Sequence, residues 1–322
     1  MTSNHLTTAT TGRSNPSAGR GDAPATNPAS TASISVDDAY ERCKQITAAE
    51  ARNFSYGIRL LPRSKREAMC ALYAMARRID DIGDGEADSD AKLGELAEVR
   101  SSLVDLQLDT SSAGTDPVLV ALGDVARRYR IPMDALQELI DGCEMDVRGV
   151  SYDTFEDLVG YCQRVAGTVG RLSVAVYGHD AGIHGSAARV EHLADSLGVA
   201  LQITNILRDI VEDRETMGRV YLPAEDRARF GVDDDLRGPE NRLADLIRFE
   251  AERARGWYSE GLQLLPLLDW RSRACTAAMA GIYRRLLDRI EADPMSVTRG
   301  RVSLSSASKA RVAARALIRG EA

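Results

Sequence analysis

Two acidic segments of the sequence place carboxylates one helical turn apart. In residues 77–84, Asp80 and Asp84 are four residues apart and would share one face of a helix, with their Cβ atoms about 6 Å apart. Like charges at this spacing destabilise a helix, and the helix dipole disfavours anions near the C-terminus, where these residues are expected. Carboxylates at this separation suit Mg²⁺, which binds one or two of them together with waters and substrate phosphates. A solvated acidic helix end is the alternative interpretation.

The second segment, residues 202–213, combines a polar stripe with apolar flanks. Gln202, Asn205, Asp209 and Asp213 are spaced by three, four and four residues, so they would lie on one face of a helix. The residues between them are strongly apolar: Ile203, Ile206, Leu207, Ile210 and Val211. A solvated outer face would explain the two aspartates but not these flanks. Buried polar groups need partners, and metal ions with a diphosphate would supply them.

Together, the two segments indicate a metal-dependent reaction of a diphosphate. Two such helices facing each other across a cavity would hold a cluster of Mg²⁺ ions. Those ions would bind the diphosphate of a substrate whose tail occupies the apolar interior. The metal charge and nearby arginines would stabilise diphosphate as a leaving group and leave an allylic carbocation in a dry pocket.

The elements expected to position these residues are helices. From about residue 36, apolar residues recur at spacings of three and four, and strict two-residue alternation is hard to find. We predict helices at about 37–53, 64–84, 117–129, 132–148, 154–177, 186–215, 240–265, 271–292 and 303–319. Because several of these exceed 20 residues, we expect an all-α bundle around a central cavity, formed by one domain over residues 36–322. Residues 1–35 have hardly any large apolar side chains and are expected to form a disordered tail.

The composition excludes other classes of protein. The 322 residues include 41 Lys plus Arg and 48 Asp plus Glu, a net charge of −7, so the chain is no generally basic nucleic-acid binder. No apolar run approaches the roughly 20 residues of a membrane span. The five cysteines are scattered, which suits a reducing cytoplasm. The basic segment with Lys309, Arg311, Arg315 and Arg319 is either a plain surface helix or a peripheral contact with an anionic membrane such as the inner membrane.

Five segments, in order along the chain, resemble the squalene and phytoene synthase family of head-to-head prenyl transferases. They are residues 53–62 (Asn-Phe-Ser-Tyr, then Leu-Leu-Pro), 72–84 (the first aspartate motif and the preceding arginine), 161–170 (Tyr-Cys-Gln-Arg-Val-Ala-Gly-Thr-Val-Gly), 202–213 (the second aspartate motif) and 218–223 (Gly-Arg-Val-Tyr-Leu-Pro). The resemblance runs from about residue 40 to 305. It implies an all-α isoprenoid synthase fold and a condensation of two prenyl diphosphates that depends on Mg²⁺, for which Mn²⁺ is a possible substitute.

The resemblance also implies roles for individual residues. The metal ligands would be Asp80, Asp84, Asn205, Asp209 and Asp213. The substrate contacts would be Phe54, Ser55, Tyr73, Arg77, Gly167, Gln202, Asn205, Arg208, Tyr221, Tyr283 and Arg301. The catalytic set would be Tyr161, Arg77, Asp80, Asp84, Asp209 and Asp213. Either diphosphate itself or Tyr161 would take up the proton lost in the first condensation.

Some of these residues also have simpler interpretations. Gly167 and Gly170, three residues apart, would let their helix approach a partner helix as readily as an isoprenoid chain. For Tyr161 and Tyr283, the simpler interpretation is an ordinary core aromatic with a hydrogen-bonded hydroxyl.

Within the family, residues 56–62, 76–84 and 170–174 look most like bacterial enzymes of hopanoid pathways that stop at presqualene diphosphate. We therefore expect two farnesyl diphosphates to give presqualene diphosphate, without NADPH. The lack of a Gly-rich nucleotide motif does not exclude NADPH, because full squalene synthases lack one too. The alternatives are phytoene synthesis from two geranylgeranyl diphosphates, and full squalene or dehydrosqualene synthesis.

Two further alternatives lie outside this family. A terpene cyclase or a head-to-tail prenyl transferase would share the fold and the metal ions, but residues 161–170 and 202–213 favour head-to-head chemistry. A non-catalytic helical scaffold would explain the composition but not the polar stripe between apolar flanks. The oligomeric state is not indicated by the sequence.

Overall fold

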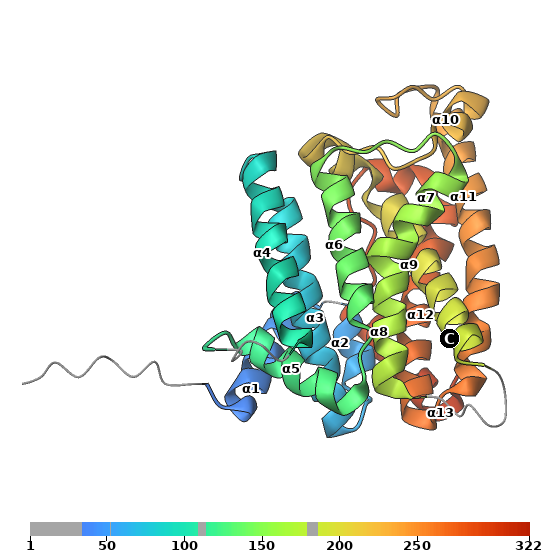
Figure 1. Ribbon diagram of the computed structural model, residues 1–322. Coiled ribbons are helices and arrows are strands. Elements are labelled where there is room, and N and C mark those ends of the chain that lie inside the picture. The colour runs from blue at the N-terminus through green and yellow to red at the C-terminus, as the bar shows by residue number, and fades with distance from the viewer. Residues whose placement is uncertain (1–33, 52, 109–113, 179–185) are drawn as a thin grey trace, which may run out of the picture. The chain divides into compact units, whose positions relative to one another are not determined.

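The computed structural model describes residues 34–51, 53–108, 114–178 and 186–322, which belong to one compact unit (Figure 1). These residues form helices and contain no strand, which confirms the expected all-α fold. The expected tail over residues 1–35 lies outside the described residues, apart from its last two positions. No helix within the described ranges is long and apolar enough to cross a membrane.

The helices are α1 (Val36–Glu50), α2 (Phe54–Ile58), α3 (Arg63–Asp84), α4 (Ser89–Gln107), α5 (Pro117–Tyr129), α6 (Met133–Val147), α7 (Phe155–Cys162), α8 (Thr168–Tyr177), α9 (Ala187–Met217), α10 (Ala224–Phe230), α11 (Glu240–Gly261), α12 (Trp270–Ala292) and α13 (Ser306–Arg319). The π-helical segment η1 (Gln163–Gly167) joins α7 to α8, and the 3₁₀ segments η2 (Leu262–Leu267) and η3 (Pro294–Thr298) follow α11 and α12.

Several helices begin where local signals predict. The Asp116 carboxylate accepts hydrogen bonds from the first backbone N–H groups of α5, and Pro117 is the first residue of that helix, which is the position where proline is best tolerated. At the start of α7, Thr154 and Asp157 cap each other's backbone reciprocally. The helix that carries the first acidic segment, α3, ends at Asp84 as predicted.

Three features differ from the predictions. The pattern does not reveal α4 because this helix buries only Leu96 and Leu103, so it has no apolar stripe of helical period. The short helices α2 and α10 were not predicted either. The single helix expected over residues 154–177 is divided by η1, and π-helical turns of this kind often occur at functional sites.

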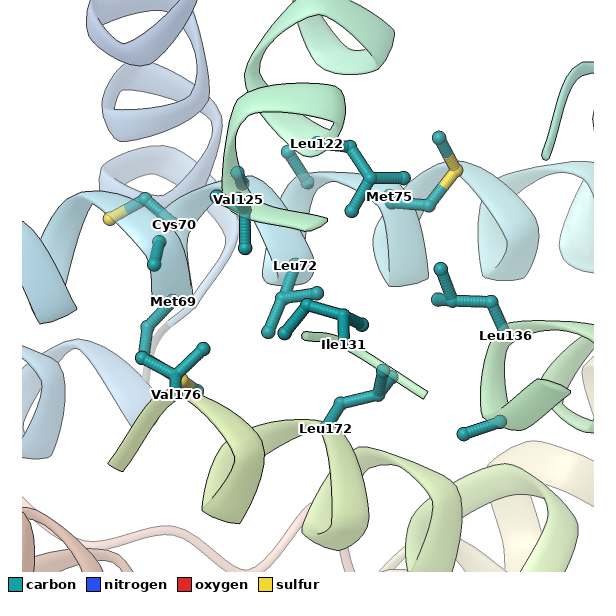
Figure 2. Close-up of a cluster of buried hydrophobic side chains, with 14 of the residues drawn as sticks. Met69, Cys70, Leu72, Met75, Leu122, Val125, Ile131, Leu136, Leu172 and Val176 are labelled. Carbon is teal, nitrogen blue, oxygen red and sulfur yellow. The ribbon is translucent and has the colours of Figure 1, made fainter. Parts of the chain in front are cut away.

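The helices that carry the two acidic segments belong to different parts of the core. α3 packs against α1, α5, α6 and α8, and Figure 2 shows Leu72 and Met75 of α3 among Leu122 of α5 and Leu172 of α8. α9 packs against α8, α11 and α12. A cavity with a volume of about 220 Å³ lies between these parts, lined by residues of α2, α3, α8, α9 and α12.

Candidate active site

The cavity is apolar along most of its length and polar at one end. Its wall on α3 runs from Met69 to Asp80 and its wall on α9 from Ala194 to Asn205. On both helices the polar lining residues lie toward the C-terminus, and they are Arg77, Asp80, Gln202 and Asn205. The ion pair between Asp84 and Arg219, 2.8 Å long, joins the C-terminal end of α3 to the segment that follows α9. The two polar ends therefore meet at the same end of the cavity.

The acidic segment on α3 contains aspartates in different surroundings. Asp80 is exposed toward the cavity, yet the protein around it desolvates its carboxylate; this desolvation, reinforced by the charge of Asp84, raises the pKa of Asp80 to about 7. Asp84 is about half exposed and pairs with Arg219. Asp81 points to solvent and pairs with Arg77 at 2.6 Å.

The acidic segment on α9 is balanced mainly by two arginines. Arg208 is buried, and its Nε donates to the Asp209 carboxylate at 2.8 Å. Arg301, from the segment between η3 and α13, reaches the same carboxylate at 3.0 Å. Asp213 has no ion pair within the described residues, and burial, together with the charge of Asp209, raises its pKa to about 7.

Asn205 supplies a neutral oxygen between these acids. Its amide nitrogen donates to Gln202 at 3.3 Å, whereas its buried Oδ1 has no hydrogen-bond partner among the described residues. Such an orphaned acceptor is costly unless a ligand satisfies it. The buried Nε of Arg77 likewise lacks a hydrogen-bond acceptor there.

The donor set fits Mg²⁺. Within the described residues, no three carboxylates, histidines or cysteines approach closely enough to enclose an ion by themselves. Mg²⁺ does not need such a cage, because it usually takes one or two carboxylates and completes its shell with waters and substrate phosphate oxygens. The aspartates of both helices and the free oxygen of Asn205 are hard oxygen donors of this kind.

Two rings of an aromatic group line the cavity near its polar end, and the third, Tyr283, is buried behind them. Phe54 of α2 lies with its ring centroid 6.4 Å from Tyr73 and 5.8 Å from Tyr283, and Phe54 and Tyr73 both line the cavity. Ser55, next to Phe54 on α2, is partly buried. These rings come from three different helices, so the tertiary fold alone brings them together.

Tyr161 and Tyr221 lie in a second aromatic group. Their rings stack with centroids 5.2 Å apart, and Tyr152 packs against both. Both hydroxyls donate to the carboxylate of Asp146, Tyr161 at 2.8 Å and Tyr221 at 2.9 Å. Neither tyrosine is among the described residues that line the apolar cavity.

The two glycines of residues 161–170 pack closely against α9. A Cβ at Gly167 would lie 2.8 Å from a carboxylate oxygen of Asp195, and one at Gly170 would lie 2.5 Å from the backbone oxygen of Ala194. Gly170 also lines the cavity, whereas Gly167 is not among its lining residues within the described part of the chain. The geometry thus favours the helix-packing interpretation for Gly167.

Sequence reasoning did not select two residues of this region, Asp146 and Arg219. Asp146 follows Asp141 and Glu144 on α6, so it resembles part of an ordinary solvated acidic face. Arg219 lies in residues 218–223, a segment that the resemblance had marked, but its pairing with Asp84 depends on the fold. Burial by itself would lower the pKa of Arg219, but nearby acids such as Asp146 more than offset it, so the pKa is raised.

Comparisons with known proteins agree with this geometry. The family model for squalene/phytoene synthase matches residues 47–308. A phytoene synthase from Mycobacterium tuberculosis (strain ATCC 25618 / H37Rv) is 48% identical over 288 residues, which cover 88% of this chain and 91% of that protein. A phytoene synthase from Arthrospira platensis is 38% identical over 280 residues, covering 81% and 86%.

Solved structures show the same architecture. A dehydrosqualene synthase in complex with a ligand superposes with a TM-score of 0.76 at 27% identity and covers 87% of this chain and 95% of its own. The squalene synthase HpnC from Alicyclobacillus acidocaldarius has a TM-score of 0.71 at 28% identity, covering 81% and 96%. The chain therefore belongs to the squalene/phytoene synthase family of head-to-head prenyl transferases and has the all-α isoprenoid synthase fold.

Proposed function

We propose that this protein condenses two molecules of geranylgeranyl diphosphate to phytoene and releases two diphosphates. The observation that carries the chemistry is an apolar cavity with two acidic helix faces at one end. The choice of substrate is supported by two relatives that are named phytoene synthases. This chain matches them over most of their length. These names favour the alternative over the presqualene diphosphate synthesis that we expected from the sequence.

The polar end would bind the metal and the diphosphate. Asp80, Asp84, Asn205, Asp209 and Asp213 would hold Mg²⁺ or Mn²⁺. The bound metal would neutralise the diphosphate and stabilise it as a leaving group. Three arginines would add hydrogen bonds to diphosphate oxygens: Arg77, Arg208 and Arg301.

The apolar part would hold the prenyl chains and exclude water. The faces of Phe54, Tyr73 and Tyr283 would stabilise an allylic cation through their π-electrons. Gln202 and Ser55 would contact the substrate near the polar end. Because water would quench a carbocation, a dry cavity is required for the reaction.

The proposed reaction has two stages. In the first, one substrate loses diphosphate, the double bond of the other attacks the allylic cation, and loss of a proton closes a cyclopropane to give prephytoene diphosphate. In the second, the remaining diphosphate leaves, the ring opens by rearrangement, and loss of another proton gives phytoene. Neither stage consumes a reductant, so NADPH is not required. Released diphosphate would take up the first proton, or Tyr161 would do so while its own phenol proton passes to the Asp146 carboxylate.

The test is a product analysis with purified protein. Geranylgeranyl or farnesyl diphosphate is supplied with Mg²⁺, with and without NADPH, and the products are extracted. We expect phytoene from geranylgeranyl diphosphate regardless of NADPH, and no product after chelation of the metal. Failure to convert geranylgeranyl diphosphate would contradict the proposal.

Synthesis from farnesyl diphosphate is the second candidate. It is favoured by the structural similarity to a dehydrosqualene synthase and to a squalene synthase. Presqualene diphosphate as the end product would restore our expectation from the sequence. Squalene that forms only with NADPH would instead identify a full squalene synthase.

We also propose that α13 makes a peripheral contact with the cytoplasmic face of an anionic membrane. Ile318 is 82% exposed and Leu317 42% exposed, and Arg315 and Arg319 lie beside them on the same helix. Exposed apolar residues flanked by arginines are typical of helices that bind such surfaces. Co-sedimentation with anionic vesicles should be lost on Ile318→Glu, and equal binding by this variant would contradict the contact.

A further inference from the structure

A carboxylate outside both acidic segments lies beside the candidate active site. Asp146 is on the last turn of α6 and is partly buried. Desolvation is the main cause of the raised pKa values of Asp80 and Asp213, followed by the charges of Asp84 and Asp209. The charge of Asp146 is a smaller contribution to both. Asp146 is therefore close enough to both acidic segments for its charge to be felt there.

The oxygens of Asp146 are occupied by two phenols from different parts of the chain. Its Oδ2 accepts from Tyr161 of α7 at 2.8 Å, and its Oδ1 accepts from Tyr221, which follows α9, at 2.9 Å. The two phenol oxygens are themselves 3.4 Å apart. One carboxylate thus fixes two hydroxyls at once.

The acceptor role of Asp146 follows from its partners, because each tyrosine hydroxyl donates to a different carboxylate oxygen. Burial raises its pKa, but the positive charge of Arg219 and the two phenol donors oppose this shift. Burial also raises the pKa values of Tyr161 and Tyr221, so both phenols retain their protons. The geometry directs both hydrogen bonds from tyrosine to aspartate.

We propose that Asp146 is a positioning residue that holds the Tyr161 hydroxyl in one orientation for the prenyl transfer, an inference that rests on the proposed function. An O–H group donated to Asp146 is not free for donation to a diphosphate oxygen. Tyr161 would therefore act through its ring on a cation, or through its oxygen on a departing proton while its own proton passes to Asp146. Its contribution belongs to the chemical steps rather than to the binding of diphosphate.

The test is a double-mutant cycle between Asp146→Asn and Tyr161→Phe. An asparagine in the same orientation replaces one of the two carboxylate oxygens by an NH₂ donor, so one of the two phenols loses the acceptor that it now has. We expect Asp146→Asn to lower kcat by about 30-fold with KM changed less than about threefold. In the Tyr161→Phe background the same change should lower kcat by less than about twofold, because the group it positions is gone.

Matched variants separate this role from a general loss of structure. Asp141→Asn makes the same substitution on α6 at an exposed residue paired with Arg100, and its kcat should equal that of the wild type. Tyr221→Phe leaves the Asp146–Tyr161 hydrogen bond in place and should cost less than Asp146→Asn. If Asp146→Asn does not fold, Asp146→Glu, which displaces the same two acceptors by one methylene, gives the same comparison.

The outcomes are distinct. An equal loss of kcat from Asp146→Asn in both backgrounds, or a loss confined to KM, would overturn the positioning role. Rates are measured as diphosphate release with both geranylgeranyl and farnesyl diphosphate. A wrong substrate would show in the wild type as a preference for farnesyl diphosphate, whereas a wrong role for Asp146 would show only in the variants.

Discussion

The two acidic segments carry the same pair of aspartates, four residues apart, but their charges are balanced by different parts of the chain. On α3, Asp84 pairs with Arg219, which lies beyond the end of α9. On α9, Asp209 pairs with the adjacent Arg208 and with Arg301, from the far end of the chain. In each of these pairs, Asp80/Asp84 and Asp209/Asp213, one aspartate is thus held by arginine.

The other aspartate of each pair, Asp80 on α3 and Asp213 on α9, has no ion pair within the described residues. Desolvation raises the pKa of Asp80 and of Asp213 to about 7, with further contributions from Asp84 and Asp209 respectively. Two like charges on one helix face are tolerated because one is paired with arginine and the raised pKa of the other weakens its charge at neutral pH. The comparison teaches that residues with the same motif position differ in their electrostatic state.

The largest effect is expected from removing the aspartates without ion pairs. Asp80→Asn and Asp213→Asn should each lower kcat/KM by about 100-fold or more, because they remove charge from the proposed metal-binding end of the cavity. Glu86→Gln and Glu215→Gln, which change exposed acids beside the two segments, should have little effect. Steady-state assays with saturating Mg²⁺ measure this, and a loss of less than threefold at either aspartate would break the comparison.

Stability should distinguish the two aspartates of α9. Asp209→Asn leaves the buried Arg208 with an uncompensated charge, which should lower the free energy of unfolding by about 2 kcal/mol. Asp213→Asn removes an unpaired, partly buried carboxylate and should leave stability unchanged or higher. Thermal unfolding at pH 8 without metal tests this, and an equal loss in both variants would show that the arginine pairs do not separate the two residues.

Arg301 should affect binding more than the chemical steps. It is about half exposed at the polar end and reaches Asp209 from outside the helix, so Arg301→Gln should raise KM about tenfold and change kcat little. Arg311→Gln, on the exposed face of α13, is the control. A drop in kcat without a change in KM would place Arg301 in the chemistry instead.

The smallest effect on activity is expected at Glu250, a fully buried acid on α11. A variant of this residue tests whether a raised pKa alone marks a functional residue. Burial raises its pKa to about 8, although Arg253, at 3.1 Å, opposes the shift. Between about pH 4.5 and 8 the folded state binds more protons here than the unfolded state, so stability falls as pH rises through this range.

Glu250→Gln should remove this part of the pH dependence. The Tm of the variant should fall less than that of the wild type between pH 5 and 8, by a few degrees, while kcat stays within about twofold. Glu252→Gln, an exposed acid on the same helix, should show the wild-type slope. Loss of activity in Glu250→Gln would mean that this acid takes part in the reaction and would extend the comparison beyond the two segments.

The sequence was sufficient for the family, the all-α class and the positions of both acidic segments. These depend on local order: the spacing of three and four residues is itself the helix period, and Asp80, Asp84, Asp209 and Asp213 can be read from it directly. The helix α4 was missed because it lacks that period, and the choice between prenyl chain lengths was not determined by motifs that the relatives share.

Tertiary structure alone decided which charges meet. Nothing in the local sequence links Asp84 to Arg219 or Asp209 to Arg301, and an acid on α6 gives no sign that it will accept hydrogen bonds from Tyr161 and Tyr221. The physical reason is that ion pairs and pKa shifts depend on distance and desolvation in three dimensions. Residues far apart in the chain acquire these properties only after the helices pack around the cavity.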